Sequence, residues 1–345
     1  MENREKDPSN MRKVILEEYA QFQEGFCTVD NATKEIIPLV KPYKRILVFG
    51  MGGSALPCDI TDIYIRDAAV RLHFPYIPFS SFRSYETPLE SSKETLHIIC
   101  SHSGNTEETL SALEVIAKKG FPLIGVSSGG TLERRCLELD IPFVKLPIPF
   151  LNFQPRMASG HFFSVLIGIL IRSGILPEIL REEILSEAKN MQQCIENQEM
   201  IAKEIGESLK GKTPIIYSSE RFRALAMTWK IKINENAKTP AFWNYFPELN
   251  HNEMVGFTYP QAEFSFFLLR DEDEDPRILR RFEVFSQLMK KAGREVKIID
   301  ISGNTVYSKL FSTLSFGDWV SYYLALAYDI DPTPVDMVEA FKKML

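Results

Sequence analysis

Short apolar runs and amphipathic stretches alternate along the first half of the chain, and this alternation limits the available folds more than any other feature. The runs are rich in Ile, Val, Leu and Phe and fit buried strands, while the stretches between them fit helices. Strand and helix in this alternation predict a mostly parallel sheet with helices on both faces. The expected strands are residues 45–50, 68–74, 96–100, 122–126 and 142–146, and the expected helices are residues 54–64, 106–118 and 131–139.

A proline-rich segment at residues 147–155 interrupts the alternation, and a second strand–helix series follows it. Long helices are expected at residues 157–173 and 177–209, strands at 213–217, 263–269 and 295–300, and a last helix at 335–345 with Thr333 as its N-cap candidate. We therefore predict an α/β protein of two doubly wound, mainly parallel domains with flanking helices, residues 1–152 and 153–345.

Composition and charge disfavour several classes of protein. A net charge of −6 and a pI near 5.6 argue against a nucleic-acid binder, which carries a basic face. The apolar run at residues 162–175 is too short to span a bilayer and contains Arg172, so we expect a buried core helix. The charged N-terminus lacks the apolar stretch of a signal peptide, and we expect a cytoplasmic protein without membrane partners.

Cysteine and histidine give no sign of a disulfide framework or a metal site. The five cysteines, at positions 27, 58, 100, 136 and 194, form no CxxC pair, so buried reduced thiols are expected. The five histidines show no zinc-ligand spacing, and neither a metal nor a cofactor is expected. The acidic run at residues 271–275 follows an expected strand and is interpreted as a solvated turn.

Two glycine- and hydroxyl-rich segments follow expected strands and open expected helices. The first, Gly50-Met-Gly-Gly-Ser-Ala55, contains Gly53 and Ser54 and formally matches the dinucleotide pattern G-x-G-x-x-G/A. A dinucleotide site also needs an acid at the end of the second strand, whereas the expected strand ends at Phe74 without one. An NAD-dependent enzyme is therefore a weak alternative.

The second segment, Ser101-His-Ser-Gly-Asn-Thr106, indicates a phosphate site. Backbone N–H groups and the dipole of a helix N-terminus favour an anion, and hydroxyls at 101, 103 and 106 can donate to its oxygens. The segment has no P-loop lysine, so a phosphate monoester suits it better than a nucleoside triphosphate. An ordinary capping turn, with Thr106 as N-cap, is the alternative.

Three further segments accompany these two: Gln154-Pro-Arg156, Asn234-Glu-Asn236 and Glu248-Leu-Asn-His-Asn-Glu253. In this order, the five segments resemble the sugar isomerase (SIS) domains of bifunctional phosphoglucose/phosphomannose isomerases, from about residue 35 to the C-terminus. The resemblance implies two SIS-type domains. It also implies metal-independent interconversion of fructose 6-phosphate with glucose and mannose 6-phosphates through an enediol. A homodimer is implied as well, with a histidine reaching the partner's active site.

The resemblance also implies a role for each matching residue. Ser54, Ser101, Ser103 and Thr106, with Gly53, would hold the phosphate; Glu235 would be the base, Arg156 would stabilise the enediolate, and His251 and Lys342 would open the sugar ring. Lys343 is an adjacent alternative to Lys342, and relatives often carry Tyr in place of His102.

Other functions stay open from the residues alone. A carboxylate between two asparagines suits proton transfer if partial burial raises its pKa, but Glu235 is equally compatible with a solvated helix end. A sugar-phosphate sensor would need the hydroxyl turns without Glu235, Arg156 and His251 together. An amino-sugar isomerase or a lyase of another phosphosugar is the alternative among enzymes.

Overall fold

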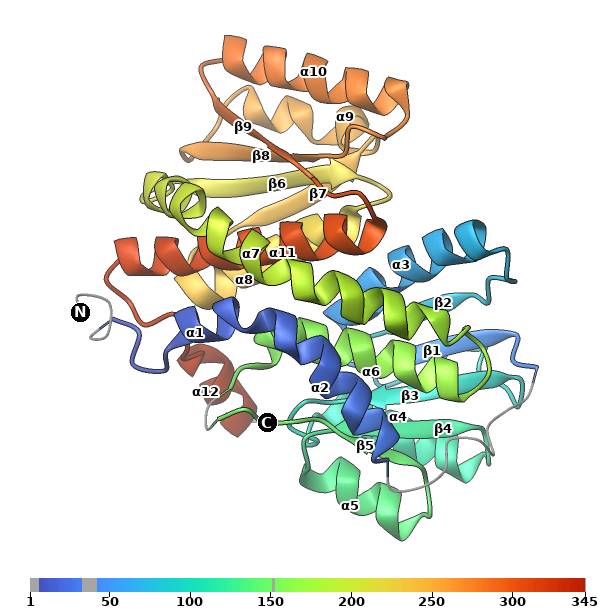
Figure 1. Ribbon diagram of the computed structural model, residues 1–345. Coiled ribbons are helices and arrows are strands. Elements are labelled where there is room, and N and C mark those ends of the chain that lie inside the picture. The colour runs from blue at the N-terminus through green and yellow to red at the C-terminus, as the bar shows by residue number, and fades with distance from the viewer. Residues whose placement is uncertain (1–5, 33–41, 151–152, 345) are drawn as a thin grey trace. The chain divides into compact units, whose positions relative to one another are not determined.

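The computed structural model describes residues 6–32, 42–150 and 153–344 (Figure 1). The chain divides into two compact units, which we call the first unit (Glu17–Asn190) and the second unit (Met1–Leu16 with Met191–Leu345). The boundary expected at residue 152 falls inside the first unit, because helix α6 (Ser159–Arg172) packs there against α2 (Gln21–Asp30) and α3 (Leu56–Leu72).

The first unit contains a five-stranded parallel sheet in the order β2-β1-β3-β4-β5. Its strands are β1 (Arg45–Phe49), β2 (Phe79–Phe82), β3 (Thr95–Cys100), β4 (Leu123–Ser127) and β5 (Phe143–Lys145). Leu47 of β1 packs with Leu113 of α4 (Glu107–Lys118) and Leu132 of α5 (Gly130–Glu138) in one core cluster. Ile46 and Val48 point to the opposite face and are buried too, so helices cover both faces as predicted.

The strand predicted at residues 68–74 is wrong, because this segment is the end of α3. Ala68 and Ala69 are strong helix formers and lie four residues after Tyr64 and Ile65, on the same buried side of α3. The helix ends at His73, which adopts a left-handed conformation with φ 56°. The second strand is β2 instead. Its two central residues are serines, so the segment lacks the apolar run by which the other strands were predicted.

Helix α6 confirms the prediction of a buried core helix, since every residue from Ser159 to Ile171 is buried. Among the residues that the structure describes, none of the helices has the length and apolar character needed to cross a membrane.

The second unit contains a four-stranded parallel sheet in the order β7-β6-β8-β9. Its strands are β6 (Thr213–Ser219), β7 (Phe242–Phe246), β8 (Phe264–Arg270) and β9 (Glu295–Asp300), and only β7 was not among the predicted strands. Trp229 of α8 (Arg223–Ala237) packs between Phe267 of β8 and Phe316 of α11 (Val306–Ala327). On the other face, helix α9 (Leu249–Asn252) and helix α10 (Pro276–Lys291) contribute to a core cluster with β6 and β8. Helices α1 (Met11–Leu16) and α12 (Asp336–Met344) also belong to this unit, and α7 (Ile179–Ser208) begins in the first unit and ends in the second.

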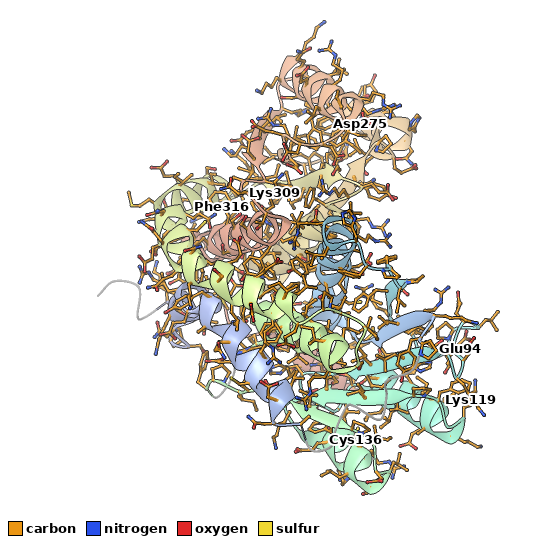
Figure 2. All side chains as sticks on the ribbon, turned by 45° about the vertical axis from the view of Figure 1, so that its right-hand side comes forward. Glu94, Lys119, Cys136, Asp275, Lys309 and Phe316 are labelled. Atoms are coloured by element: carbon orange, nitrogen blue, oxygen red, sulfur yellow. The ribbon has the colours of Figure 1, made fainter. Side chains whose placement is uncertain are left out.

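Two predictions about polar residues need correction. The acidic run after β8 is not wholly solvated, because Asp271 is only 3% exposed and accepts a hydrogen bond of 2.7 Å from Lys309 of α11. Figure 2 labels Lys309 and also Asp275, the last residue of the run. All five cysteines are free thiols as expected, but Cys27 is exposed and Cys194 is only partly buried.

Candidate active site

The two hydroxyl-rich turns meet at the point of the first sheet where the connections change direction. From β1 the chain passes through α3 to β2 on one side, and from β3 it passes through α4 to β4 on the other side. Ligands of open α/β sheets bind at such a point, outside the carboxyl ends of the strands. Because β1 and β3 are neighbours, their following turns lie side by side there.

The first turn is shaped by a close approach to Arg156. A Cβ atom on Gly53 would lie 2.7 Å from the backbone nitrogen of Arg156, so only glycine fits between the turn and the helical turn η4 (Pro155–Met157). Ser54 ends the helical turn η3 (Gly52–Ser54), and its hydroxyl accepts a hydrogen bond of 3.0 Å from the backbone nitrogen of His102. The two turns are therefore bonded to each other.

The second turn orders its hydroxyls at the start of α4. The Ser101 hydroxyl lies 2.8 Å from that of Thr106 and accepts a hydrogen bond of 3.1 Å from the Gly104 nitrogen. Thr106 occupies the N-cap position, as the capping alternative requires, but its hydroxyl makes no cap bond to the described residues of α4. Ser103 is exposed and accepts from the Asn105 nitrogen at 3.2 Å. The first N–H groups of α4 thus stay available to an anion.

A third hydroxyl-rich turn, residues 127–131, was missed in the sequence. It follows β4 and opens α5. Its Ser128 nitrogen donates to the carbonyl of His102 at 3.0 Å, and its Thr131 nitrogen donates to Asn105 Oδ1 at 3.0 Å. The signal was present, since Ser127-Ser-Gly-Gly-Thr131 is rich in hydroxyls and glycine like the second turn and also lies between an expected strand and an expected helix.

His102 joins the three turns through its backbone, while its side chain anchors the second turn on α6. The ring lies 6.0 Å from that of Phe153 and 6.4 Å from that of Phe162. Burial, assisted by the nearby charge of His161, lowers the pKa of His102 to about 4. The side chain is therefore neutral at ordinary pH and acts as packing beneath the turn.

Arg156 lies against the first turn and is only 2% exposed. Its Nη1 donates to Gln154 Oε1 at 3.2 Å. A buried guanidinium keeps its charge and several N–H donors at any ordinary pH, so it can bind an oxyanion that forms nearby.

Glu235, His251 and Lys342 all belong to the second unit. Glu235 lies near the end of α8 and is partly buried, between two asparagines that are both bonded within the unit. Asn234 donates to the Thr239 carbonyl at 2.7 Å, and Asn236 donates to the Ser321 hydroxyl at 2.9 Å. These bonds fix the last turn of α8 and with it the backbone of Glu235.

His251 and Lys342 are exposed. His251 lies on the short helix α9, and Lys342 lies on α12, where its ammonium pairs with Glu339 of the same helix at 2.8 Å. Thr333, the expected N-cap, precedes α12 by more than one residue, because α12 begins at Asp336. Of the predicted site residues, the structure thus brings together the four hydroxyls, Gly53 and Arg156 in the first unit.

The second strand, whose end would supply a carboxylate to a dinucleotide, is β2 and not residues 68–74. The actual strand β2 ends at Phe82 and is followed by Arg83, which again supplies no carboxylate for a ribose.

Comparison with known proteins agrees with this geometry. Residues 198–345 match the family model described as the bacterial phospho-glucose isomerase C-terminal SIS domain. A bifunctional phosphoglucose/phosphomannose isomerase of Thermoplasma volcanium is 34% identical over 329 residues, which cover 94% of this chain and 99% of that protein. The protein of the same name from Caldicellulosiruptor bescii is 32% identical over 311 residues, 87% of this chain and 89% of the relative.

A relative with another name is also similar. The D-glucosamine-6-phosphate 4-epimerase of Sulfolobus acidocaldarius is 30% identical over 249 residues, 72% of this chain and 73% of the epimerase. Among solved structures, the C-terminal domain of glucosamine-fructose-6-phosphate aminotransferase from Francisella tularensis aligns with a TM-score of 0.73 at 15% identity. That alignment covers 94% of this chain and 98% of the solved one, and it supports the SIS-type fold.

Proposed function

The chain belongs to the bifunctional phosphoglucose/phosphomannose isomerases, and from this premise we propose that it interconverts fructose 6-phosphate with glucose 6-phosphate and mannose 6-phosphate. The observation that carries the proposal is the pair of hydroxyl-rich turns at the carboxyl ends of β1 and β3, with the buried Arg156 against the first. Such turns suit the phosphate monoester that the three sugars share.

We assign the substrate phosphate to the hydroxyls of Ser54, Ser101, Ser103 and Thr106 and to the first N–H groups of α4. Each hydroxyl can rotate to donate to a phosphate oxygen, and the helix dipole adds attraction for the negative charge. Gly53 keeps the backbone of the first turn close to Arg156.

Glu235 is assigned as the base. Its carboxylate would take the proton from C2 of the open-chain aldose to give a cis-enediolate with its negative charge on O1. The O2 hydroxyl proton then passes to O1, and Glu235 returns its proton to C1, which leaves a ketone at C2 and a hydroxymethyl group at C1. Arg156 would donate hydrogen bonds to the oxygen that becomes negative, and one such donor is worth about 3 kcal/mol. Glucose and mannose 6-phosphates differ only at C2 and form the same enediol, so proton return to either face accounts for both products.

His251 is assigned to ring opening, because a neutral imidazole can carry a proton from O1 to the ring oxygen. Lys342 is assigned to assist this step; its ammonium is exposed on α12 and would exchange its pairing with Glu339 for the substrate. Glu235, Arg156 and His251 together supply the groups that the proposed reaction uses, and the proposal includes no metal ion.

The decisive experiment incubates the purified protein with fructose 6-phosphate in excess chelator and separates the products by NMR. We expect both glucose 6-phosphate and mannose 6-phosphate. Binding of fructose 6-phosphate without any product would favour the sugar-phosphate sensor instead.

Replacing the base separates catalysis from binding. We expect Glu235→Gln to lower kcat by roughly 10²- to 10⁴-fold, because an amide cannot accept the C2 proton, while fructose 6-phosphate still binds. Steady-state kinetics and calorimetric titration measure the two effects. Glu220→Gln is the matched control, since Glu220 is an exposed carboxylate just before the same helix. Full turnover by Glu235→Gln would contradict the assignment.

The relative named as a 4-epimerase makes an amino-sugar phosphate the second candidate substrate. Incubation with D-glucosamine 6-phosphate, followed by NMR of C4, tests it directly. A product changed at C4, with no reaction of fructose 6-phosphate, would replace the proposed activity.

We also infer a homodimer with shared active sites and a cytoplasmic location, both from the family resemblance. Analytical ultracentrifugation tests the dimer, and a single species at the 39.5 kDa mass of one chain would contradict it.

A further inference from the structure

We propose that Glu253 is a positioning residue, which holds helix α9 on the sheet of the second unit and so fixes the backbone position from which the His251 imidazole projects. The inference rests on the ring-opening role proposed for His251 and adds the device that holds the histidine in place.

Residues on two neighbouring strands donate hydrogen bonds to the carboxylate of Glu253. The Tyr217 hydroxyl on β6 donates to Oε1, and the Asn244 amide on β7 donates to Oε2. Tyr217 and Asn244 are register partners, so their side chains leave adjacent strands at the same level. Asn244 Oδ1 accepts from the Tyr245 nitrogen at 2.8 Å, which turns the NH₂ group of Asn244 toward Glu253.

Tyr217 is a rigid, permanent donor. Its side chain is fully buried, and its ring lies 5.4 Å from that of Phe285 and 6.1 Å from that of Phe246. Burial and the bond to Glu253 raise the pKa of Tyr217 far above its usual value. The hydroxyl therefore keeps its proton, and the aromatic cluster holds it in one place.

The hydrogen bonds of Glu253 hold the helix that carries His251. Leu249 is fully buried on the core side of α9, and Glu253 directly follows the helix as its C-cap residue, with its nitrogen donating to the Leu249 carbonyl at 3.1 Å. His251 lies between them on the opposite, exposed side. Arg281 of α10 donates a hydrogen bond to Asn250 Oδ1 at 3.1 Å, so a second side chain also holds α9 in place.

A helix as short as α9 does not hold its shape by itself. Isolated helices need about 12 to 15 residues to be even marginally stable, whereas α9 has 4. Its orientation therefore comes from Leu249, Asn250 and Glu253. Displacing a reacting group by about 1 Å can lower a rate 10²-fold, so the bonds of Glu253 bear directly on ring opening.

The test compares a cyclic and an acyclic substrate. In Glu253→Gln the side chain keeps its shape but has a single acceptor oxygen, so its NH₂ group faces another donor. We expect kcat for fructose 6-phosphate to fall by roughly 10- to 100-fold with KM little changed. 5-Deoxyfructose 6-phosphate lacks the ring oxygen and stays open-chain, so its turnover should equal that of the wild type.

Two further variants complete the design. Tyr217→Phe removes one donor and should lower kcat for the cyclic sugar alone, with an effect that is not additive with Glu253→Gln. Glu283→Gln, an exposed carboxylate of α10, should leave both substrates unaffected. Equal losses on both substrates, or unchanged kcat, would overturn the inference. If His251→Ala also left turnover of the cyclic sugar unchanged, the proposed role of the histidine itself would be wrong.

Discussion

At the scale of single residues, the phosphate turns depend on a glycine whose side-chain space is already filled by backbone. Gly104 has φ +69°, and a Cβ atom there would lie 1.8 Å from the carbonyl oxygen of Gly129 in the third turn. An alanine would have to push the second and third turns apart, because a backbone carbonyl cannot rotate away as a flexible side chain can. The Ser101 hydroxyl, which accepts from the Gly104 nitrogen, would move with it.

We therefore expect Gly104→Ala to raise KM for fructose 6-phosphate by about tenfold or more, since the misplaced hydroxyls lose hydrogen bonds to the charged phosphate worth about 1.5 kcal/mol or more. Gly120→Ala is the matched control, because Gly120 also has positive φ, +63°, but no atom within 4 Å of the added Cβ. That variant should lose about 1 kcal/mol of stability and keep its KM. Steady-state kinetics and urea unfolding check both, and an unchanged KM in Gly104→Ala would contradict the assigned phosphate site.

At the scale of elements, the second turn packs against α6 through the side chain of His102. Its ring is buried beside Phe153 and Phe162, and His161, which pairs with Glu24 at 2.6 Å, is the charged neighbour that acts on it. The pKa of His102 is lowered from 6.5 to about 4 in the folded chain. Between pH 6.5 and about 4 the unfolded chain therefore binds a proton that the folded chain does not.

This difference predicts the sign and the pH window of a loss in stability. Above pH 6.5 neutral His102 makes its full contribution to the free energy of unfolding. As the pH falls from 6.5 to about 4 this contribution is lost, and the loss is roughly 3 kcal/mol in total. His102→Phe keeps an aromatic ring in the pocket and removes the titration. We expect its free energy of unfolding, measured in urea from pH 7 to 4, to fall less steeply than that of the wild type. Identical pH profiles would show that His102 is not responsible.

At the scale of the whole molecule, the N-terminal segment belongs to the unit formed by the C-terminal part of the chain. Arg12 of α1 donates to both carboxylate oxygens of Glu199 on α7, at 2.6 Å each. The hydroxyl of Tyr323 on α11 donates to the same carboxylate at 2.6 Å. Residues at opposite ends of the sequence thus share one network, which secures α1 to the second unit.

Arg12→Ala should destabilise the second unit by about 1 to 2 kcal/mol, because a bidentate charged pair and its shared tyrosine bond are lost together. Hydrogen exchange should rise in α1 and in the part of α11 around Tyr323. Arg71→Ala removes a similar bidentate pair, with Glu183, from the first unit and should leave exchange in the second unit unchanged. Equal exchange in wild type and Arg12→Ala would show that this network does not hold α1.

The amino-acid sequence by itself determined the class of fold and the positions of the first two turns. Alternating strand and helix periodicities are local signals, and Gly-Gly-Ser or Ser-x-Ser-Gly after a strand forms a turn whatever lies elsewhere in the chain. For this reason the strands at β1, β3, β4, β6, β8 and β9 and the helix α6 agree with prediction. The strand at residues 68–74 failed because its short apolar run fitted a helix equally well, and only packing selects between the two.

Tertiary structure alone decided which distant residues meet. It places Arg156 against Gly53, buries Asp271 beside Lys309, and brings Tyr217 and Asn244 to Glu253. Each contact joins segments whose separation along the chain is set by the packing of whole helices and strands. Local propensity carries no information about such pairs, because the free energy that forms them comes from burial and hydrogen bonding in the assembled unit.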